Sequence, residues 1–169
     1  MSASTCETCG QRPATLNCES CNKAICKKCR KLLETAAFDF WQKVPKEISH
    51  SLYCENCWEL NVVPAQIRYD ELMAKAEQTF YVSKNYPGYV RIFRKHTKKV
   101  EVTDCRDRKE AQLRMAFQAA ELGFNSIIEA EIDSKKARSN ERSSTLWWAS
   151  SLPADIDGER YEKNSLKGF

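Results

Sequence analysis

The pattern of apolar and polar residues first indicates a helix near the middle of the chain. Residues 64–78 have apolar side chains at Ile67, Leu72 and Met73, with acidic and basic residues among the other positions. This spacing is typical of a helix with one apolar stripe, and Pro64 suits the first helical turn. We therefore expect residues 63–78 to form a connecting helix between an N-terminal and a C-terminal domain.

A second helix is predicted over residues 107–122. Its apolar residues fall on one face: Leu113, Ala116, Phe117 and Ala120. Asp104 or Asp107 can cap its start, and Gly123 suits the left-handed position that often follows the end of a helix. This is the long helix expected in the C-terminal half of the chain.

Segments rich in β-branched and aromatic residues flank that helix. The predicted strands are residues 79–83, 89–93, 98–103, 126–133 and 145–152. The polar run 134–144 predicts a loop, and residues 153–169, which have little apolar content, predict a loosely ordered tail. We therefore expect residues 79–152 to form a compact α+β domain, with one helix packed on a mainly antiparallel sheet.

Residues 1–62 contain eight of the nine cysteines of the chain. They form four Cys-x2-Cys pairs: Cys6/Cys9, Cys18/Cys21, Cys26/Cys29 and Cys54/Cys57. Two cysteines at this spacing can supply two of the four ligands of a tetrahedral Zn²⁺, so four pairs can complete two sites. A redox pair, in contrast, is usually single and follows a strand. The sequence therefore predicts two zinc ions as cofactors, and these replace much of a hydrophobic core.

The residues that follow each pair predict how the eight cysteines are shared. The segments after Cys29 and Cys57 resemble helix starts, and those after Cys9 and Cys21 resemble turns. A treble-clef site joins one pair of each kind. This assigns Cys6, Cys9, Cys26 and Cys29 to one ion, and Cys18, Cys21, Cys54 and Cys57 to the other. The alternative is two consecutive quartets, which would not interleave.

The full spacing, C-x2-C-x8-C-x2-C-x4-C-x2-C-x24-C-x2-C, resembles the cross-brace zinc fingers, which include FYVE, B-box and RING domains. The runs CESCNKAICKKC and LYCENCWEL are most similar to FYVE-related fingers, and the short first loop resembles a B-box. The resemblance implies a binuclear, interleaved finger that binds a partner. It also leaves open a ubiquitin-ligase function of the RING or B-box type.

The C-terminal half carries a second resemblance, in residues 104–152. Its alanine-rich helix and the run ELGFNSIIEAEID resemble the small bacterial YbjQ-like family, which is described as heavy-metal-binding. This resemblance implies a compact α+β fold that self-associates into rings.

Composition and charge restrict the class of protein. The chain has 169 residues, 42% of them hydrophobic, and a formal net charge of +4. It is too apolar to be disordered and has no run of about 20 apolar residues that could cross a membrane, so we expect a cytoplasmic protein. Each zinc ion with four thiolates has a net charge of −2, so two loaded sites would bring the protein close to neutral.

A basic segment and a tryptophan pair remain as candidate sites. The basic side chains are Arg91, Arg94, Lys95, Lys98 and Lys99. They could bind nucleic acid or an anionic membrane, but the favoured interpretation is a solvated hairpin edge. Adjacent residues of a strand point to opposite faces, so one of Trp147 and Trp148 can fill the core and the other can lie at an interface.

The sequence contains none of the motifs that we associate with catalysis. Its histidines number two, and it has neither a G-x-S-x-G motif nor a phosphate-binding loop. We therefore expect a protein without enzymatic activity. The predicted function is that of a zinc-binding scaffold, with protein partners and with self-association through the α+β domain.

Overall fold

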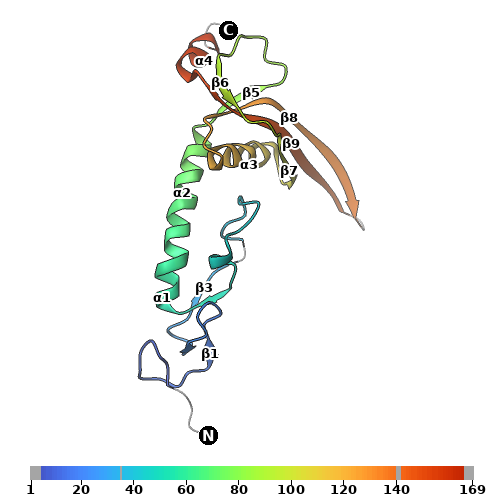
Figure 1. Ribbon diagram of the computed structural model, residues 1–169. Helices are drawn as coiled ribbons and strands as arrows, with labels where there is room; N and C mark the ends of the chain where they lie inside the picture. Colours follow the sequence, from blue (N-terminus) through green and yellow to red (C-terminus); the bar gives the residue numbers. More distant parts are fainter. Residues whose placement is uncertain (1–4, 35, 140–141, 166–169) are drawn as a thin grey trace. The chain divides into compact units, whose positions relative to one another are not determined.

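The computed structural model describes residues 5–34, 36–139 and 142–165, and the chain divides into two compact units, Met1–Asp70 and Glu71–Phe169 (Figure 1). Each unit has its own secondary structure and its own buried residues. No helix in these residues is long and apolar enough to cross a membrane.

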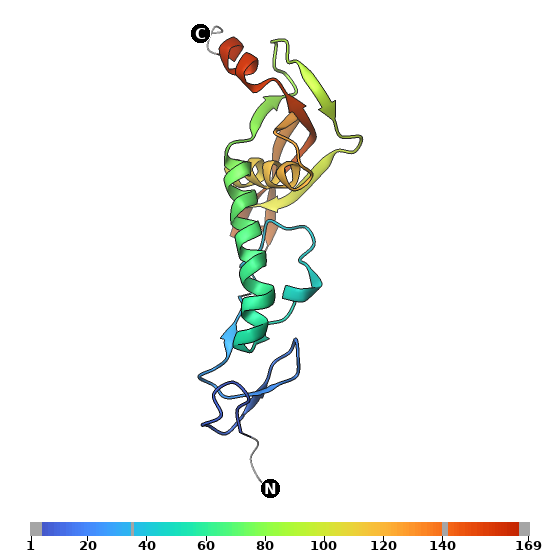
Figure 2. The same cartoon turned by 60° about the vertical axis from the view of Figure 1, so that its left-hand side comes forward.

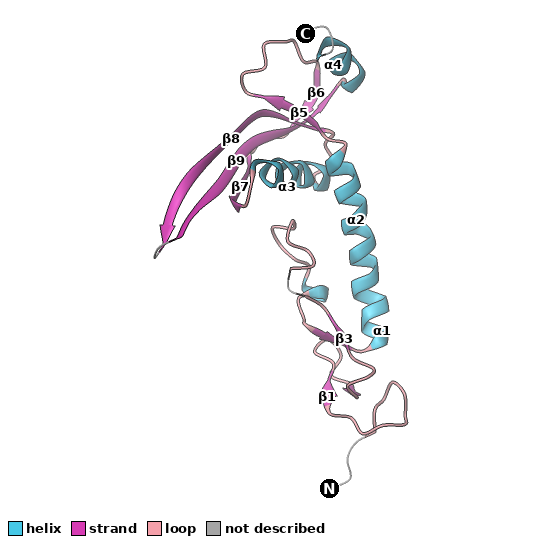
Figure 3. Cartoon of the chain, turned by 180° about the vertical axis from the view of Figure 1, so that it is seen from behind, coloured by secondary structure: helices cyan, strands magenta, loops and turns pink. Residues whose placement is uncertain are grey.

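The first unit is built largely from loops joined by very short strands (Figure 3). Its strands are β1 (Leu16–Asn17), β2 (Ala24–Ile25), β3 (Lys31–Leu32) and β4 (Leu52–Tyr53). β1 pairs with β2 and β3 with β4, both antiparallel. Two-residue strands provide little cooperative stability by themselves, so this unit needs another source of stability.

The helix that starts in the first unit begins earlier than the sequence predicted. Three consecutive helical segments follow Cys54: α1 (Glu55–Cys57), a π-helical stretch (Trp58–Val62) and α2 (Val63–Glu77). The predicted helix over 64–78 is therefore present, and it extends back to the last cysteine pair. The Cys54 side chain caps its start by accepting a hydrogen bond from the Cys57 N–H at 3.4 Å.

The helix start that we predicted after Cys29 is wrong. Residues Lys31–Leu32 form β3, and the segment that follows contains turns and a short 3-10 helix, η1 (Lys46–Ile48). This segment is held by an aromatic cluster, in which Phe38, Trp41 and Tyr69 have ring centroids 5.1 to 5.2 Å apart. The apolar residues that suggested a helix therefore anchor a loop to α2.

The second unit contains a five-stranded sheet. Its strands are β5 (Phe80–Ser83), β6 (Ile92–Lys95), β7 (Val100–Cys105), β8 (Ser126–Ser139) and β9 (Arg142–Ile156). The sheet has the order β5-β8-β9-β6, and β7 also pairs with β9. β5 and β8 are parallel, and all the other pairs are antiparallel. The predicted α+β fold with a mainly antiparallel sheet is confirmed.

One face of this sheet is covered by α3 (Arg108–Glu121). Asp107 caps the helix by accepting a hydrogen bond from the Glu110 N–H at 2.8 Å, and Gly123 has a φ of +77° just after it. The core on this face contains Val102, Cys105, Ala111, Met115, Ala119, Ile127 and Ala149. The predicted helix and both of its boundary signals are confirmed, with Asp107 as the cap.

The other face has a second helix that the sequence analysis did not predict. α4 (Gly158–Ser165) follows β9 (Figure 2), and the Tyr161 hydroxyl donates a hydrogen bond to the Tyr81 carbonyl at 2.7 Å. The core on this face contains Val82, Ile128, Leu152, Ala154 and Ile156. The predicted tail is therefore wrong for residues 153–165, because Pro153 continues β9 and does not end it.

The predicted loop over 134–144 is also wrong. β8 extends to Ser139 and β9 begins at Arg142, so the two strands pair over most of this range. Polar composition suggested a loop, but β-propensity depends on context, so polar residues can also pair as strands.

Candidate metal centre

The first cysteine group joins the first and third pairs of the chain. The Sγ atoms of Cys6, Cys9, Cys26 and Cys29 all lie within 4.8 Å of one another, and those of Cys9 and Cys26 are 4.0 Å apart. The side chains of Cys6 and Cys26 are buried, and those of Cys9 and Cys29 are partly exposed.

The second group joins the second and fourth pairs. The Sγ atoms of Cys18, Cys21, Cys54 and Cys57 also lie within 4.8 Å of one another, with 3.7 Å between Cys21 and Cys54. The two groups therefore interleave along the chain. They have the membership that the sequence analysis favoured, and the alternative of consecutive quartets is wrong.

The sulfur separations fit zinc. A tetrahedron with Zn–S bonds of about 2.3 Å has sulfur–sulfur edges of about 3.8 Å. The separations of 3.7 and 4.0 Å match these edges, and a disulfide would require about 2.05 Å. Each group can therefore bind one zinc ion through four thiolates.

Ionisation within each group also favours a cation. Hydrogen bonds from the backbone, chiefly that of Cys9, lower the pKa of Cys6 to about 6. The hydrogen bond with Cys26, together with burial, raises the pKa of Cys29 to about 12. Once thiols such as Cys6 have ionised, their negative charge makes Cys29 hard to deprotonate. A divalent ion at the centre of the group would offset this repulsion between thiolates.

The second group has the same division. Burial raises the pKa of Cys18, but hydrogen bonds from the backbone of Cys21 and Cys54 outweigh it and bring the pKa to about 7. Burial and hydrogen bonds with neighbouring thiols raise the pKa of Cys57 to about 12. Both groups therefore combine easily ionised thiols with thiols that need a cation to ionise.

Each of the first two cysteine pairs lies in a turn, and the two turns have the same backbone conformation. Gly10 has a φ of +63° and Asn22 a φ of +64°, each directly after the second cysteine of its pair. Their N–H groups donate to the carbonyls of Cys6 and Cys18, both at 2.8 Å. Glycine and asparagine are the residues that best tolerate this conformation, so the related runs CETCG and CESCN carry a signal that the sequence analysis did not use.

A glutamate in each of these turns connects it to the strand that leads to its partner pair. The Glu7 carboxylate accepts a hydrogen bond from the Ala24 N–H at 3.0 Å. The Glu19 carboxylate accepts hydrogen bonds from the N–H groups of Ser51 at 2.8 Å and Leu52 at 3.3 Å. Neither glutamate could be recognised from the sequence, because a carboxylate near thiolates gives no separate signal of this role.

The predicted basic segment divides into paired and unpaired residues. Arg94 forms an ion pair with Asp155 at 2.8 Å, and Lys95 forms one with Glu129 at 3.4 Å. Arg91, Lys98 and Lys99 form no ion pair with another residue in the described part of the chain.

The two predicted interface tryptophans have different surroundings. Trp147 packs against the core beneath α3, whereas Trp148 is 41% exposed. This is the division that their adjacent positions in a strand predicted.

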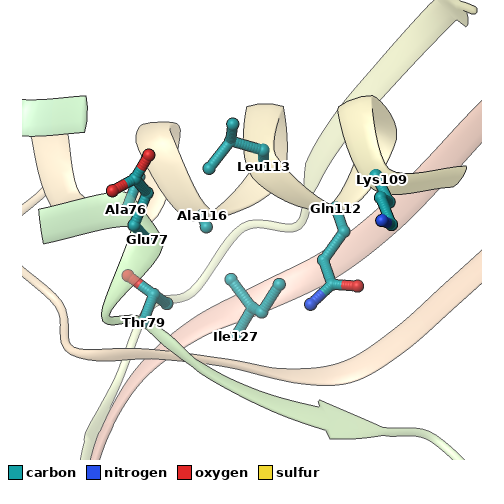
Figure 4. A pocket seen from close by; sticks show the side chains of 8 residues that line it. All are labelled: Ala76, Glu77, Thr79, Lys109, Gln112, Leu113, Ala116 and Ile127. Carbon is teal, nitrogen blue, oxygen red and sulfur yellow. The ribbon is translucent and has the colours of Figure 1, made fainter. Parts of the chain in front are cut away.

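The second unit also has an open pocket of about 360 Å³ between the end of α2, α3 and β8 (Figure 4). Leu113, Ala116 and Ile127 supply apolar surface, and Gln112 and Lys109 supply polar groups. Its lining contains no cysteine or histidine, so this pocket is not a further thiolate or imidazole metal centre.

Comparison with known proteins identifies the first zinc-binding segment. Residues 2–35 match the family of B-box zinc fingers, a segment that includes six of the eight paired cysteines. The fourth pair, Cys54 and Cys57, lies beyond the match. Residues 2–35 are therefore similar to a B-box zinc finger, and the second cysteine group is completed outside this segment by Cys54 and Cys57 at the start of a helix.

No curated protein and no solved structure matches the chain significantly. The resemblance of residues 104–152 to the YbjQ-like family thus finds no support in these comparisons.

Proposed function

We propose that this protein is a scaffold in which a zinc-stabilised finger binds a protein partner and the α+β unit self-associates. The closed chemistry of the two cysteine groups carries the proposal. Four thiolates complete the coordination of a tetrahedral zinc ion, which leaves no open position for a substrate or a reactive water. We therefore assign the zinc ions a structural role and propose no enzymatic activity.

A groove in the first unit supports partner binding. It has a volume of about 250 Å³ and lies between the segment around Trp41 and Ile48 and the beginning of the helix. Trp41 and Ile48 are buried beneath it, but Leu60 at its rim is 66% exposed. Glu47 and Arg68 add opposite charges to the lining. An apolar floor with a charged rim is typical of a site that binds an apolar anchor of another protein.

Replacing Leu60 with glutamate is expected to weaken this binding at least tenfold without unfolding the finger. Full-length, zinc-loaded protein is used as bait, and captured proteins are then tested for direct binding by calorimetry. A true partner should bind the Leu60→Glu variant at least tenfold more weakly, because a charge replaces an apolar contact.

Leu32→Glu is the matched control, since Leu32 is 55% exposed in the same unit and does not line the groove. A partner that binds the unmodified protein and both variants equally would have its binding site elsewhere, which would contradict the assignment of the groove as the partner site.

The proposed self-association rests on the distal part of the β8–β9 hairpin (Figure 1). β5 pairs with β8 only as far as Ala130, and β7 pairs with β9 only from Trp147 onward. In the described residues the outer edges of the hairpin beyond these points are therefore unpaired. Leu146 and Trp148 lie two residues apart in β9, so they share a face, and both are partly exposed. A second copy of the chain could pair with such an edge and cover both side chains.

Replacing Trp148 with serine is expected to shift the protein toward monomer. Sedimentation velocity over a range of concentrations should show a dissociation constant at least tenfold higher than for the unmodified protein. Leu122→Ser is the control, because Leu122 is similarly exposed but lies at the end of α3. A protein that is monomeric at every concentration would refute the self-association.

A further inference from the structure

We propose that the second unit binds single-stranded nucleic acid along the segment that leads into and follows β6. The binding surface consists of Tyr89, Arg91, Phe93 and Lys98, which we call the aromatic–cationic strip. This activity goes beyond the scaffold function and does not depend on it.

Two exposed aromatic rings provide the first observation. Tyr89 is 68% exposed and Phe93 is 62% exposed, although both are large apolar side chains. The Arg160 guanidinium lies over the Tyr89 ring at 5.6 Å, and that of Arg91 lies over the Phe93 ring at 5.2 Å. Each ring therefore has a cation beside it. In proteins that bind single-stranded nucleic acid, the bases stack on such rings and the cations bind the phosphates.

The local charge provides the second observation. No acidic residue occurs between positions 84 and 100. Arg94 and Lys95 are neutralised by Asp155 and Glu129. Arg91 and Lys98 form no ion pair with any residue that the structure describes, and both are exposed. The free positive charge of this segment is thus concentrated on the same stretch as the exposed rings.

The setting of β6 provides the third observation. In the described part of the sheet, β6 pairs only with β9, so its outer edge is accessible. Arg94 stacks on Phe124 at 4.5 Å and donates a hydrogen bond to the Gly123 carbonyl at 2.9 Å. These contacts fix one side of β6 to the unit, so Phe93 lies on a supported strand, and the other residues of the strip lie just before and after that strand.

These features favour nucleic acid over an anionic membrane. A membrane-binding surface needs a contiguous apolar face that enters the lipid, in addition to basic residues. Here each exposed ring is next to a guanidinium. Rings interleaved with cations match a polymer that alternates bases with phosphates.

The test uses the full-length, zinc-loaded protein and fluorescently labelled 12-nucleotide oligothymidine and oligouridine. Binding is measured by anisotropy between 50 and 300 mM salt. We expect binding of both oligonucleotides that weakens as the salt concentration rises. Phe93→Ala and Tyr89→Ala should each weaken binding about 5- to 100-fold, as expected for the loss of one stacked base. Because both side chains are exposed, circular dichroism and the thermal midpoint should stay unchanged.

Lys84→Gln is the matched control for charge, because Lys84 is ion-paired with Glu131 and lies outside the strip. The slope of log affinity against log salt concentration should fall by close to the value for one phosphate contact in Arg91→Gln and in Lys98→Gln. It should not change in Lys84→Gln. The proposal is overturned if no oligonucleotide binds at 50 mM salt, or if Phe93→Ala binds as tightly as the unmodified protein. Binding to phosphatidylserine vesicles without binding to either oligonucleotide would also overturn it, in favour of a membrane.

Discussion

Replacing Cys18 with serine is expected to reduce the zinc content from two ions per chain to at most one and to unfold the first unit. Cys18 is fully buried, and its group joins the second turn to the start of the helix. Binding of one structural zinc ion contributes about 10 to 16 kcal/mol in zinc-finger peptides, which equals or exceeds the whole stability of a typical domain. Two-residue strands cannot replace that contribution. Elemental analysis and amide NMR spectra of the full chain provide the measurement.

Cys105→Ser is the control for this prediction. Cys105 is also fully buried, but it belongs to the core beneath α3 and lies outside both cysteine groups. We therefore expect two zinc ions per chain and an unchanged spectrum of the first unit. If the Cys18 variant retains two zinc ions, or if the unmodified protein stays folded without metal, the structural role of zinc is refuted.

The cysteine pairing could be predicted because it depends on local chemistry. Four Cys-x2-Cys pairs and the helix start after Cys57 were visible in the sequence and are present in the structure. The helix expected after Cys29 does not form, since Phe38 and Trp41 instead pack against Tyr69, more than 25 positions away. The left-handed residues Gly10 and Asn22 are a more reliable local signal, because they mark the two turns directly.

The end of the second unit could not be predicted, because its structure depends on strand pairing between distant segments. Residues 153–169 suggested a loose tail because they have little apolar content, and Pro153 has no N–H group to donate to a neighbouring strand. In the structure it lies opposite Ile127, and its carbonyl accepts a hydrogen bond from the His96 N–H at 2.8 Å. The polar residues between 134 and 144 likewise gave no strand signal, although β8 and β9 pair through most of them. A polar composition gives no information on backbone pairing, which is what makes this segment a pair of strands.

Replacing Ala154 with aspartate tests this corrected boundary and should destabilise the second unit strongly. Ala154 is fully buried in β9, where it pairs with Ser126 of β8 and Lys95 of β6. An unpaired carboxylate at this position should lower the free energy of unfolding by about 3 to 5 kcal/mol, a large part of the stability of a domain. Urea unfolding followed through the amide signals of β9 gives the value.

The matched control for Ala154→Asp is Thr97→Asp, which introduces the same charge at an exposed position between β6 and β7. A surface change of this kind should alter the free energy of unfolding by no more than about 0.5 kcal/mol. If residues from 153 onward were a loose tail, both variants would behave alike. A large difference in the free energy of unfolding between the two variants requires that β9 continues through Ala154 as an interior strand of the sheet. Only burial between two neighbouring strands makes the same charge destabilising at Ala154 and harmless at Thr97.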